Sequence, residues 1–393
     1  MAPAVPDPLA PLAAAVNGLP AERRRKQRHY LPQPSGQLQR SGRAEQGFAL
    51  IDLASNDYLG LACHPTLQQA AQQAIAREGL GAGGSRLVSG GRPSHQQLES
   101  ALATWLGRER VLTYPSGFQA NLAAVQALAD RHTLVLADRL VHHSLLTGVK
   151  TSGAQLQRFA HNTLDDLEQR LVSIRQRDPQ RRLLVISESL FSMEGSSPNV
   201  SALSACCQRH GAALLLDEAH ALGVLGQGGR GLGHGAIGVH LISGTFGKAF
   251  GSGGAFLAGN ALIGDWLLQH SGPFRYTTAL APPLAAGALA ALQLIESHPD
   301  WGAELLLQAN AWRDALTQAG WPRPAGHGPI VPLLVGDDRR ALELQQRLEQ
   351  AGLLAVAIRP PTVPPGSARL RLVVRRGLPA GTLEKLIEAL GAP

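Results

Sequence analysis

Short apolar runs alternate with amphipathic stretches through the middle of the chain. The apolar runs have the length of buried strands, and the amphipathic stretches repeat their apolar residues at helical spacing. This order is typical of a largely parallel sheet that carries helices on both faces. The predicted strands cover residues 111–114, 133–137, 183–187, 212–216 and 240–242, and the predicted helices cover 119–128, 164–175 and 201–209.

The two ends of the chain differ from this middle part. Residues 1–45 are rich in Pro and Gln and then basic, so we expect them to be irregular, with a strand following at 49–53. A long Ala/Leu-rich helix begins at the proline pair 282–283, and short strands with one helix at 339–350 then predict a smaller α+β domain. We therefore divide the chain into an N-terminal segment (1–48), a large α/β domain (49–290) and a small C-terminal domain (291–393).

The charge is distributed unevenly along an otherwise ordinary globular composition. The net charge is +7, and residues 21–43 alone carry +6 of it. Such a basic segment could bind nucleic acid, a phosphate-bearing substrate or an acidic carrier protein, or it could be a solvated arm. Aromatic residues make up only 4 % of the chain, and few lie near this segment, so platforms for stacking single strands are scarce. We expect no nucleic-acid partner.

The cysteines and the apolar runs indicate the cellular compartment of the protein. No apolar run approaches the roughly 18 residues that span a bilayer, and the charged start of a secretory signal is missing. Cys63, Cys206 and Cys207 are odd in number and two are adjacent, which is poor geometry for a disulfide framework. We expect a reduced, cytoplasmic protein without a membrane partner. The histidines are scattered and the Cys206-Cys207 pair has no partner pair, so we also expect no metal site.

An acidic residue ends the apolar run at 214–216, where the sequence continues as Asp217-Glu218-Ala219-His220. Active sites of parallel sheets gather at the carboxyl ends of the strands. Asp217 could cap a turn, form the acidic Mg-binding box of a helicase, or pair with the pyridine nitrogen of pyridoxal phosphate. A helicase needs an upstream phosphate loop, but the Gly-Lys pair of this chain lies downstream and is followed by Ala249. We therefore reject an ATP-driven motor.

A lysine in a turn of small residues follows Asp217 at the distance that a pyridoxal-phosphate enzyme needs. Lys248 lies within SGTFGKAFGSGG, residues 243–254. Its amine must lose a proton before it can attack the cofactor, and a desolvated, glycine-lined pocket favours that loss. The turn at 114–121 leads from a strand into a helix whose free N–H groups suit a phosphate. Together, the spacing of Asp217, His220 and Lys248 favours a pyridoxal-phosphate site.

These motifs resemble the α-oxoamine synthases, which are fold-type I pyridoxal-phosphate-dependent enzymes. The resemblance runs from about Leu50 to the C-terminus. It implies a large domain with a mostly parallel mixed sheet flanked by helices, a smaller α+β domain, and a homodimer. It also implies an acyltransferase that uses pyridoxal 5'-phosphate to condense a small amino acid with an acyl thioester. The matching motifs, in the family's order, are SNDYLG at 55–60, GGSR at 83–86, FSMEG at 191–195, DEAH at 217–220, TFGK at 245–248 and YTT at 276–278.

Two further runs narrow the resemblance within this family. IRPPTVPPG at 358–366 and RFAHN at 158–162 are similar to the member that serves biotin biosynthesis. That member condenses L-alanine with pimeloyl-CoA or pimeloyl-acyl carrier protein and releases CO2. The alternative is a sibling such as glycine C-acetyltransferase, whose C-terminal motif lacks the double proline before the threonine. Position 218, where the favoured member often has a second Asp, is Glu here.

The resemblance also implies residue roles. Lys248 would bind the cofactor covalently and act as the base that takes the amino acid's α-proton. Asp217 would keep the pyridine nitrogen protonated. His142 would stack on the ring and face the substrate, with His143 as the alternative if the register slips by one. The other cofactor contacts would come from Gly117, Phe118, Ser192, His220 and Thr245. Thr277 or Thr278 would reach the phosphate of the cofactor in the partner subunit.

The substrate contacts are implied in the same way. Asn56 and Arg371 resemble the pair that holds the amino acid carboxylate, for which the fork of an arginine is well suited. Thr362 resembles a contact to the acyl substrate. The family also places an N-terminal arginine near the acyl chain, and the sequence does not choose among Arg23, Arg24, Arg25 and Arg28.

Overall fold

The computed structural model describes residues 7–20, 24, 27–33, 37–40 and 49–393. Its centre is a seven-stranded sheet in the order β4-β10-β9-β8-β7-β5-β6. β10 is antiparallel to both of its neighbours, and the other neighbouring pairs are parallel. The mostly parallel mixed sheet expected from the sequence is therefore confirmed. The strands are β4 (Arg110–Tyr114), β5 (Thr133–Asp138), β6 (Gln155–Phe159), β7 (Arg182–Glu188), β8 (Ala213–Asp217), β9 (Leu241–Thr245) and β10 (Ala255–Gly259).

Helices cover both faces of this sheet, as the apolar runs predict. Successive side chains of a strand point to opposite faces, and they divide here between two separate cores. Leu214 and Leu216 pack into one core, whereas Leu215 between them packs into the other. The first core includes residues of α3 (Pro93–Leu106), α6 (Leu164–Arg177), α7 (Val200–Arg209) and α10 (Pro282–Ser297). The second includes residues of α4 (Gly117–Leu128), α5 (His143–Ser152), α8 (Ala261–His270) and α9 (Gly272–Arg275).

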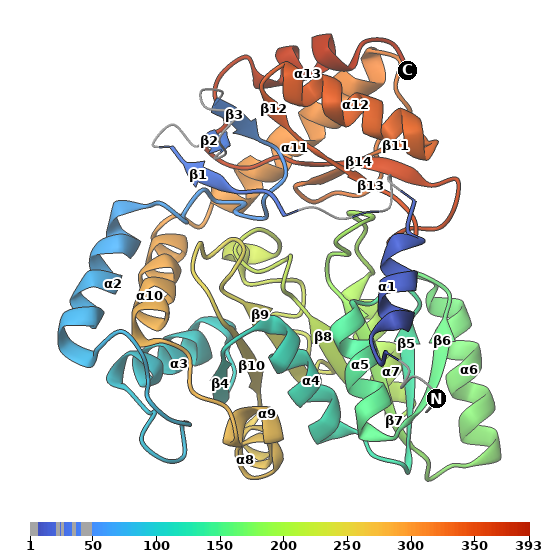
Figure 1. Cartoon of the computed structure of the whole chain (residues 1–393). Helices are drawn as coiled ribbons and strands as arrows, with labels where there is room; N and C mark the ends of the chain where they lie inside the picture. Colours follow the sequence, from blue (N-terminus) through green and yellow to red (C-terminus); the bar gives the residue numbers. More distant parts are fainter. Residues whose placement is uncertain (1–6, 21–23, 25–26, 34–36, 41–48) are drawn as a thin grey trace, which may run out of the picture.

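The C-terminal part forms a smaller α+β unit above the large sheet (Figure 1). Its three-stranded antiparallel sheet runs β11-β14-β13. A second sheet, β1-β2-β3-β12, joins strands from the two ends of the chain, because β3 is antiparallel to β2 and parallel to β12. Our three-part division of the chain stays a prediction. The elements outside the large sheet are β1 (Tyr30–Pro32), β2 (Gln37–Arg40), β3 (Ala49–Asp52), α2 (Pro65–Glu78), α11 (Trp301–Gln318), β11 (Ile330–Gly336), α12 (Asp338–Gln350), β12 (Leu353–Leu354), β13 (Val356–Ile358), β14 (Ala368–Val373) and α13 (Thr382–Leu390).

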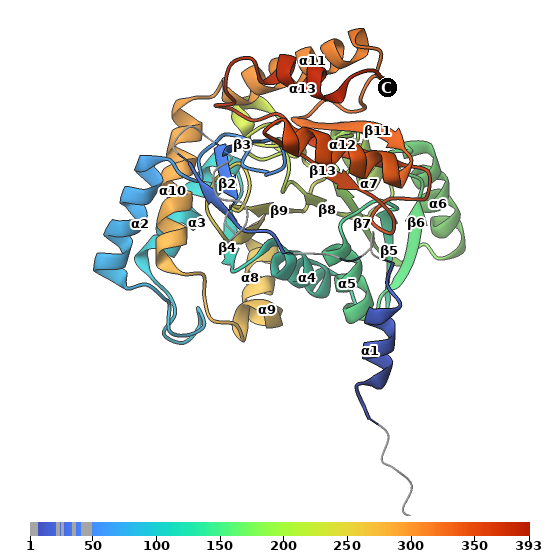
Figure 2. The ribbon, with the colours of Figure 1, turned by 45° about the horizontal axis from the view of Figure 1, so that its top comes forward.

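The expectation that residues 1–45 are irregular is wrong for their described part. Helix α1 (Ala10–Asn17) is rich in alanine and has a proline in its first turn, both of which favour a helix. It has no buried residue and extends away from the rest of the chain (Figure 2). β1 and β2 form because the edge of β3 offers unpaired backbone groups, and a search for apolar runs cannot detect this. Among the described helices, none is both long and apolar enough to cross a membrane.

Candidate active site

Acidic and hydroxyl side chains meet at the carboxyl edge of the large sheet. Asp217 is the last residue of β8, and Glu188 ends β7 directly beside it in the strand register. Thr245 ends the neighbouring strand β9, and Asp138 ends β5. Parallel strands bring their carboxyl ends to one edge, so residues spread over 107 positions of sequence share one site. Lys248 follows in the turn after β9.

The amine of Lys248 is largely desolvated and lies among charged side chains. Burial lowers the pKa of its amine to about 8, while Asp217 and Glu188 raise that pKa and Arg371 lowers it. Close to neutral pH, a sizeable fraction of the amine is therefore unprotonated and nucleophilic. An ordinary surface lysine has no such fraction.

The carboxylate of Asp217 is oriented from two sides. Its Oδ2 accepts a hydrogen bond from Asn121 Nδ2 at 2.7 Å, and its Oδ1 accepts one from the backbone N–H of Ala219 at 2.9 Å. Asn121 lies on α4 and also donates to Ser144 Oγ of α5 at 2.9 Å. The sequence analysis did not identify Asn121, because nothing in its local pattern indicates a contact with a residue 96 positions away.

A buried tyrosine fixes the state of His220. Tyr58 Oη lies 2.6 Å from His220 Nδ1. Burial raises the pKa of Tyr58 to about 12, and burial lowers the pKa of His220 well below its ordinary value. We therefore assign Tyr58 as the donor and His220 as a neutral ring with its proton on Nε2. His220 can donate its Nε2–H to an acceptor in the site.

Of the two adjacent histidines, His142 belongs to the group around Lys248. It caps the N-terminus of α5, and its Nδ1 lies 2.7 Å from Ser144 Oγ. Burial of the imidazole lowers the pKa of His142, Asp217 raises it and Lys248 lowers it, which shows that the three side chains are close. Part of the ring remains accessible, so a planar cofactor can stack on it.

Glu188 is a buried carboxyl group that the sequence analysis missed. Its Oε1 accepts the backbone N–H of His142 at 2.5 Å. Burial, followed by the charge of Asp217, raises the pKa of Glu188 well above its ordinary value. Burial therefore favours the protonated form of Glu188, and its Oε1 serves as the acceptor that positions His142.

The small C-terminal unit contributes an arginine to the same site. Arg371 of β14 donates from Nε to the carbonyl of Ser192 at 2.6 Å and from Nη2 to Asn56 Oδ1 at 2.8 Å. Its side chain is buried, and its charge acts on both Lys248 and His220. Folding thus brings Asn56, Ser192 and Arg371 together around Lys248.

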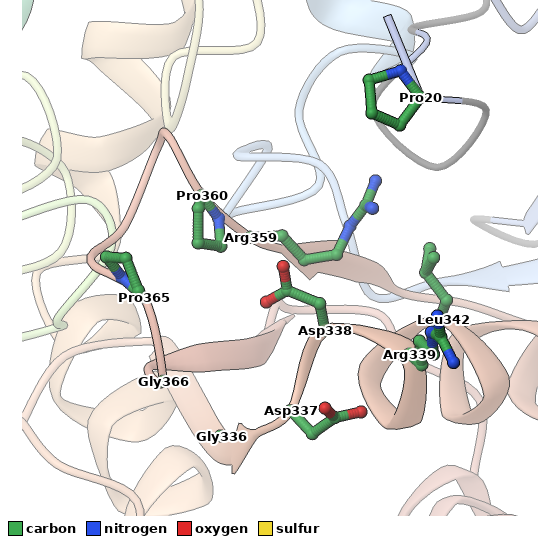
Figure 3. Close-up of a pocket in the computed structure, with 10 residues that line it drawn as sticks. All are labelled: Pro20, Gly336, Asp337, Asp338, Arg339, Leu342, Arg359, Pro360, Pro365 and Gly366. Carbon is green, nitrogen blue, oxygen red and sulfur yellow. The ribbon is translucent and has the colours of Figure 1, made fainter.

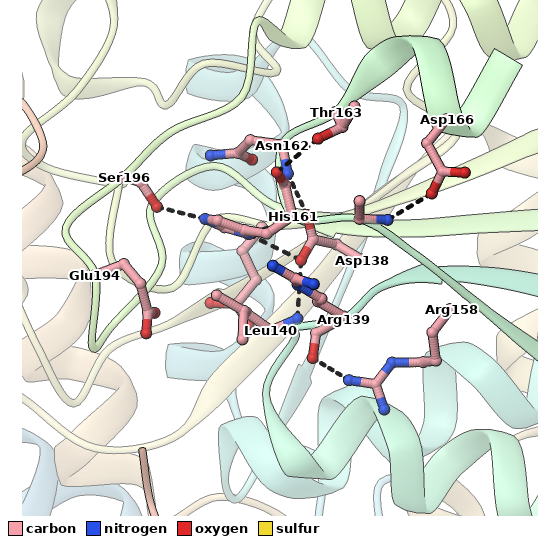
Figure 4. A network of polar contacts seen from close by, with 12 residues as sticks. Asp138, Arg139, Leu140, Arg158, His161, Asn162, Thr163, Asp166, Glu194 and Ser196 are labelled. Carbon is pink, nitrogen blue, oxygen red and sulfur yellow. Dashed lines mark hydrogen bonds and ion pairs between the residues drawn. The ribbon is translucent and has the colours of Figure 1, made fainter. Parts of the chain in front are cut away.

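A polar network holds the loops that carry these residues (Figure 4). Asp138 is fully buried and accepts from the N–H groups of Leu140 and Asn162. His161 connects it to the next loop, with Nδ1 2.9 Å from Asp138 Oδ1 and Nε2 2.8 Å from Ser196 Oγ. The network holds two loops in place. One is the segment at Leu140 that leads to His142, and the other is the loop that contains Ser192 and Ser196.

The start of α4 provides free N–H groups for an anion. Ser116 caps this helix by accepting from Gln119 N at 3.3 Å, and Gly117 and Phe118 form its first turn. A Cβ at Gly117 would lie 3.9 Å from Thr245 Oγ1, so the helix start and Thr245 face each other. Thr277 accepts a bond from Gln119 at 3.4 Å, and Thr278 is exposed one residue further on.

Thr362, a predicted contact to the acyl substrate, lies in the loop between β13 and β14. Thr362 is exposed, and its backbone N–H bonds within its own loop to Arg359. A cavity of about 730 Å³ lies beside this loop, between Pro20 and the start of α12 (Figure 3). Arg24 donates to the carbonyls of Leu19 and Asn17, and Arg28 pairs with Glu349. Arg23 and Arg25 lie outside the described residues.

Comparison with known proteins shows which family the chain is similar to. The model of the aminotransferase class I and II family matches residues 49–390. An 8-amino-7-oxononanoate synthase of Chromohalobacter salexigens is 43 % identical over 86 % of this chain and 88 % of its own length. One from Cellvibrio japonicus is 39 % identical over 97 % and 94 %.

The chain belongs to the 8-amino-7-oxononanoate synthase family.

Solved structures extend this relationship to the fold. The 8-amino-7-oxononanoate synthase of Francisella tularensis is 26 % identical and covers 87 % of this chain and 96 % of its own, with a TM-score of 0.73. A serine palmitoyltransferase of Sphingomonas wittichii is 28 % identical over 98 % and 97 %, with a TM-score of 0.89. The predicted fold-type I architecture is confirmed, and the chain is a pyridoxal-phosphate-dependent acyltransferase of this group.

The residues of this 8-amino-7-oxononanoate synthase family member fit pyridoxal 5'-phosphate. The cofactor needs a lysine whose amine loses its proton more readily than usual, and burial lowers the pKa of Lys248 to about 8. Its pyridine nitrogen needs a carboxylate, and Asp217 is one whose oxygens are already oriented. Its phosphate needs N–H and hydroxyl donors, and the start of α4 with Thr245 supplies both groups. The residues present therefore match the aldehyde, the pyridine nitrogen and the phosphate of the cofactor.

Proposed function

We propose that this protein condenses L-alanine with a pimeloyl thioester, either pimeloyl-CoA or pimeloyl-acyl carrier protein, to give 8-amino-7-oxononanoate, CO2 and the free thiol. The observation that carries the proposal is that Lys248, with its lowered pKa, lies within the electrostatic influence of Asp217 at the carboxyl edge of the sheet, in a chain of this family. The reaction would belong to biotin biosynthesis.

The roles of the site residues are part of this proposal. Lys248 would hold pyridoxal phosphate covalently, with Asp217 at the pyridine nitrogen and Ser192 and His220 at the phenolic oxygen. When bound, the cofactor supplies an electron sink for the bonds that break at the α-carbon of alanine. The free amine of Lys248 would take the α-proton, because its lowered pKa lets it act as a base near neutral pH. Gly117, Phe118, Thr245, Thr277 and Thr278 would hold the phosphate.

Further residues would bind the amino acid and the acyl chain and hold them in position. Asn56 and Arg371 already contact each other, and together they would hold the carboxylate of alanine until it leaves as CO2. His142 would stack on one face of the cofactor's pyridine ring. Thr362 would contact the acyl chain from its proline-rich loop, and a basic residue among Arg23, Arg24, Arg25 and Arg28 would lie near the same chain.

We also propose a homodimer in the cytoplasm. The loop before α3 exposes Leu80 and Val88, at 73 % and 84 % of their surface, and Tyr276 is exposed at 80 %. These two segments are adjacent, because Ala279 N–H bonds to the carbonyl of Gly84. A second subunit would cover this apolar surface next to Thr277 and Thr278. Free thiols at Cys63, Cys206 and Cys207 support a reducing compartment.

The test is a substrate-resolved assay of the purified holoenzyme. We expect CO2 release and free thiol only with L-alanine together with a pimeloyl thioester, supplied in turn on coenzyme A and on a carrier protein. Lys248→Ala should lose both this activity and the absorbance of the bound cofactor, whereas Lys150→Ala, on the exposed side of α5, should keep both. Turnover of glycine with acetyl-CoA instead would transfer the assignment to glycine C-acetyltransferase, and no cofactor absorbance at all would overturn the proposal.

A further inference from the structure

A second group of reactive side chains lies on the other face of the large sheet. Glu168 of α6, Cys206 of α7 and His210, which follows α7 directly, form what we call the α6–α7 cluster. One donor atom from each residue lies within 4.8 Å of the other two. α6 and α7 pack into the core opposite the one that contains α4 and α5, which orient Asp217. The cluster is therefore separate from the pyridoxal-phosphate site.

The spacing within the cluster is that of a helical metal site. Cys206 and His210 are four positions apart, so they lie one above the other on the same face of a helix. The turn between them is closed by the bond from His210 N–H to the carbonyl of Cys206, at 3.3 Å. Glu168 comes from the neighbouring helix α6. Leu167 of α6 and Leu203 of α7 are buried in the same core. The packing of α6 on α7 thus completes a three-residue set.

The distances suit tetrahedral zinc. Zinc bonds of about 2.0–2.3 Å to nitrogen, oxygen and sulfur place neighbouring donors of a tetrahedron roughly 3.3–3.8 Å apart. The distance from His210 Nε2 to Glu168 Oε1 is 3.6 Å. Cys206 Sγ lies within 4.8 Å of both, so a small side-chain rotation brings it into range. Sulfur, imidazole nitrogen and carboxylate oxygen are also the ligand types that zinc selects.

Burial and charge are compatible with a bound cation. Cys206 is fully buried and the side chain of His210 is only 15 % exposed, whereas Glu168 reaches solvent. A metal held here can therefore exchange with solvent and keep a water as its fourth ligand. Arg209 donates to Glu168 Oε1 at 2.6 Å, but its guanidinium is half exposed and can move aside into water.

We propose that Glu168, Cys206 and His210 bind one zinc ion, with water in the fourth position, and that this ion fastens α6 to α7. The Cys206 thiol releases its proton to solvent as the zinc–sulfur bond forms, His210 binds through neutral Nε2, and the zinc remains divalent. The sequence alone predicts no metal site, because Glu168 lies 38 residues before Cys206 and only folding brings them together. The proposal does not depend on the proposed enzymatic function.

The test is a zinc titration of the metal-free holoenzyme in competition with a coloured chelator. We expect one equivalent of tightly bound zinc in the wild-type protein. Cys206→Ser and His210→Ala should each weaken binding by more than about 100-fold, because loss of a direct ligand exceeds the 10- to 100-fold cost of losing an outer partner. Cys63→Ser and His132→Ala make the same changes at exposed positions and should bind zinc as the wild type does.

Thermal unfolding and enzymatic activity provide two further measurements. Zinc should raise the midpoint of thermal unfolding in the wild type but not in Cys206→Ser, since a ligand that binds only the folded state stabilises it. Without zinc, the variants should keep wild-type activity, which shows that they fold. If Cys206→Ser does not fold, Glu168→Gln and His210→Ala carry the test. Tight binding that survives the ligand substitutions, or no tight equivalent in the wild type, would overturn the proposal.

Discussion

Burial favours the uncharged forms of several ionisable side chains at and around Lys248. It is the largest cause of the lowered pKa values of Lys248 and His220 and of the raised pKa of Glu188. The charges of Asp217 and Arg371 then shift the pKa of Lys248 in opposite directions. A neutral amine, a neutral imidazole and a neutral carboxyl group are the states in which Lys248 can attack and the other two can donate or accept hydrogen bonds.

The pKa of Lys248 predicts how cofactor binding depends on pH. A folded-state pKa of about 8, below the usual 10.5, means that the unprotonated fraction rises about tenfold per pH unit below pH 8 and then levels off. The rate at which the apoenzyme gains cofactor absorbance should follow this curve. Nα-acetyl-lysine in solution provides the reference for an unshifted amine, and an enzyme rate that keeps rising in parallel with it towards pH 10 contradicts the prediction.

Glu188 offers a test of how burial acts on a carboxyl group. Burial raises the pKa of Glu188 well above its ordinary value and so favours the uncharged form, and Glu188→Gln keeps an oxygen that can accept the His142 N–H, so we expect little change in stability or activity. Glu188→Ala leaves that N–H without its acceptor, and the free energy of unfolding should fall by about 1–3 kcal/mol. Urea denaturation of both variants measures the difference. Equal damage from Gln and Ala would mean that Glu188 acts through its charge.

At the scale of elements, the contact between α4 and α5 determines the geometry of Asp217. Gly148 of α5 lies where the two helices are closest, because a Cβ there would come within 2.8 Å of Val125 and 3.4 Å of the carbonyl of Asn121. The sequence predicted α4 but not α5, since α5 has few apolar residues and begins at the His142-His143 pair. The need for glycine at position 148 arises from the neighbouring helix.

Substitution of this glycine should separate the two helices. In Gly148→Ala, the crowding against Val125 should outweigh the roughly 1 kcal/mol that alanine gains in helix propensity, with a net loss of about 1–2 kcal/mol in the free energy of unfolding. Activity should fall as well, because Asn121 moves relative to Asp217. Gly81→Ala is the matched control, since a Cβ there meets nothing within 4 Å and should change stability by less than about 0.5 kcal/mol. Equal unfolding curves for the two variants would contradict this account.

At the scale of the whole molecule, the active site lies between the large sheet and the small C-terminal unit. Arg371 joins them through Ser192 and Asn56, and its neighbour Arg369 donates to the carbonyl of Met193 at 3.1 Å. The N-terminal strand β3 pairs with β12 at the other end of the chain. Closure of the site therefore depends on contacts between segments that are more than 300 residues apart.

The role of Arg371 in this closure can be measured in substrate binding. Arg371→Lys keeps the charge but loses the fork that contacts both Ser192 and Asn56. We expect KM for L-alanine to rise about 10- to 100-fold, consistent with the loss of charge-assisted hydrogen bonds, and KM for the pimeloyl thioester to change much less. Arg77→Lys on the exposed face of α2 is the control. An unchanged KM for L-alanine would remove Arg371 from the proposed carboxylate site.

The sequence by itself determined the alternation of buried strands and helices, the mixed fold-type I sheet and the family. It could do so because apolar periodicity and motifs such as those around Asp217 and Lys248 are local properties of the chain. Tertiary structure alone decided the partners of these residues: Asn121 beside Asp217, Tyr58 beside His220, Glu188 beneath His142, and the pairing of β1 and β2 onto β3. The same is true of the shifted pKa values around Lys248 and of the α6–α7 cluster, because desolvation and contact depend on distances in space that no spacing along the chain encodes.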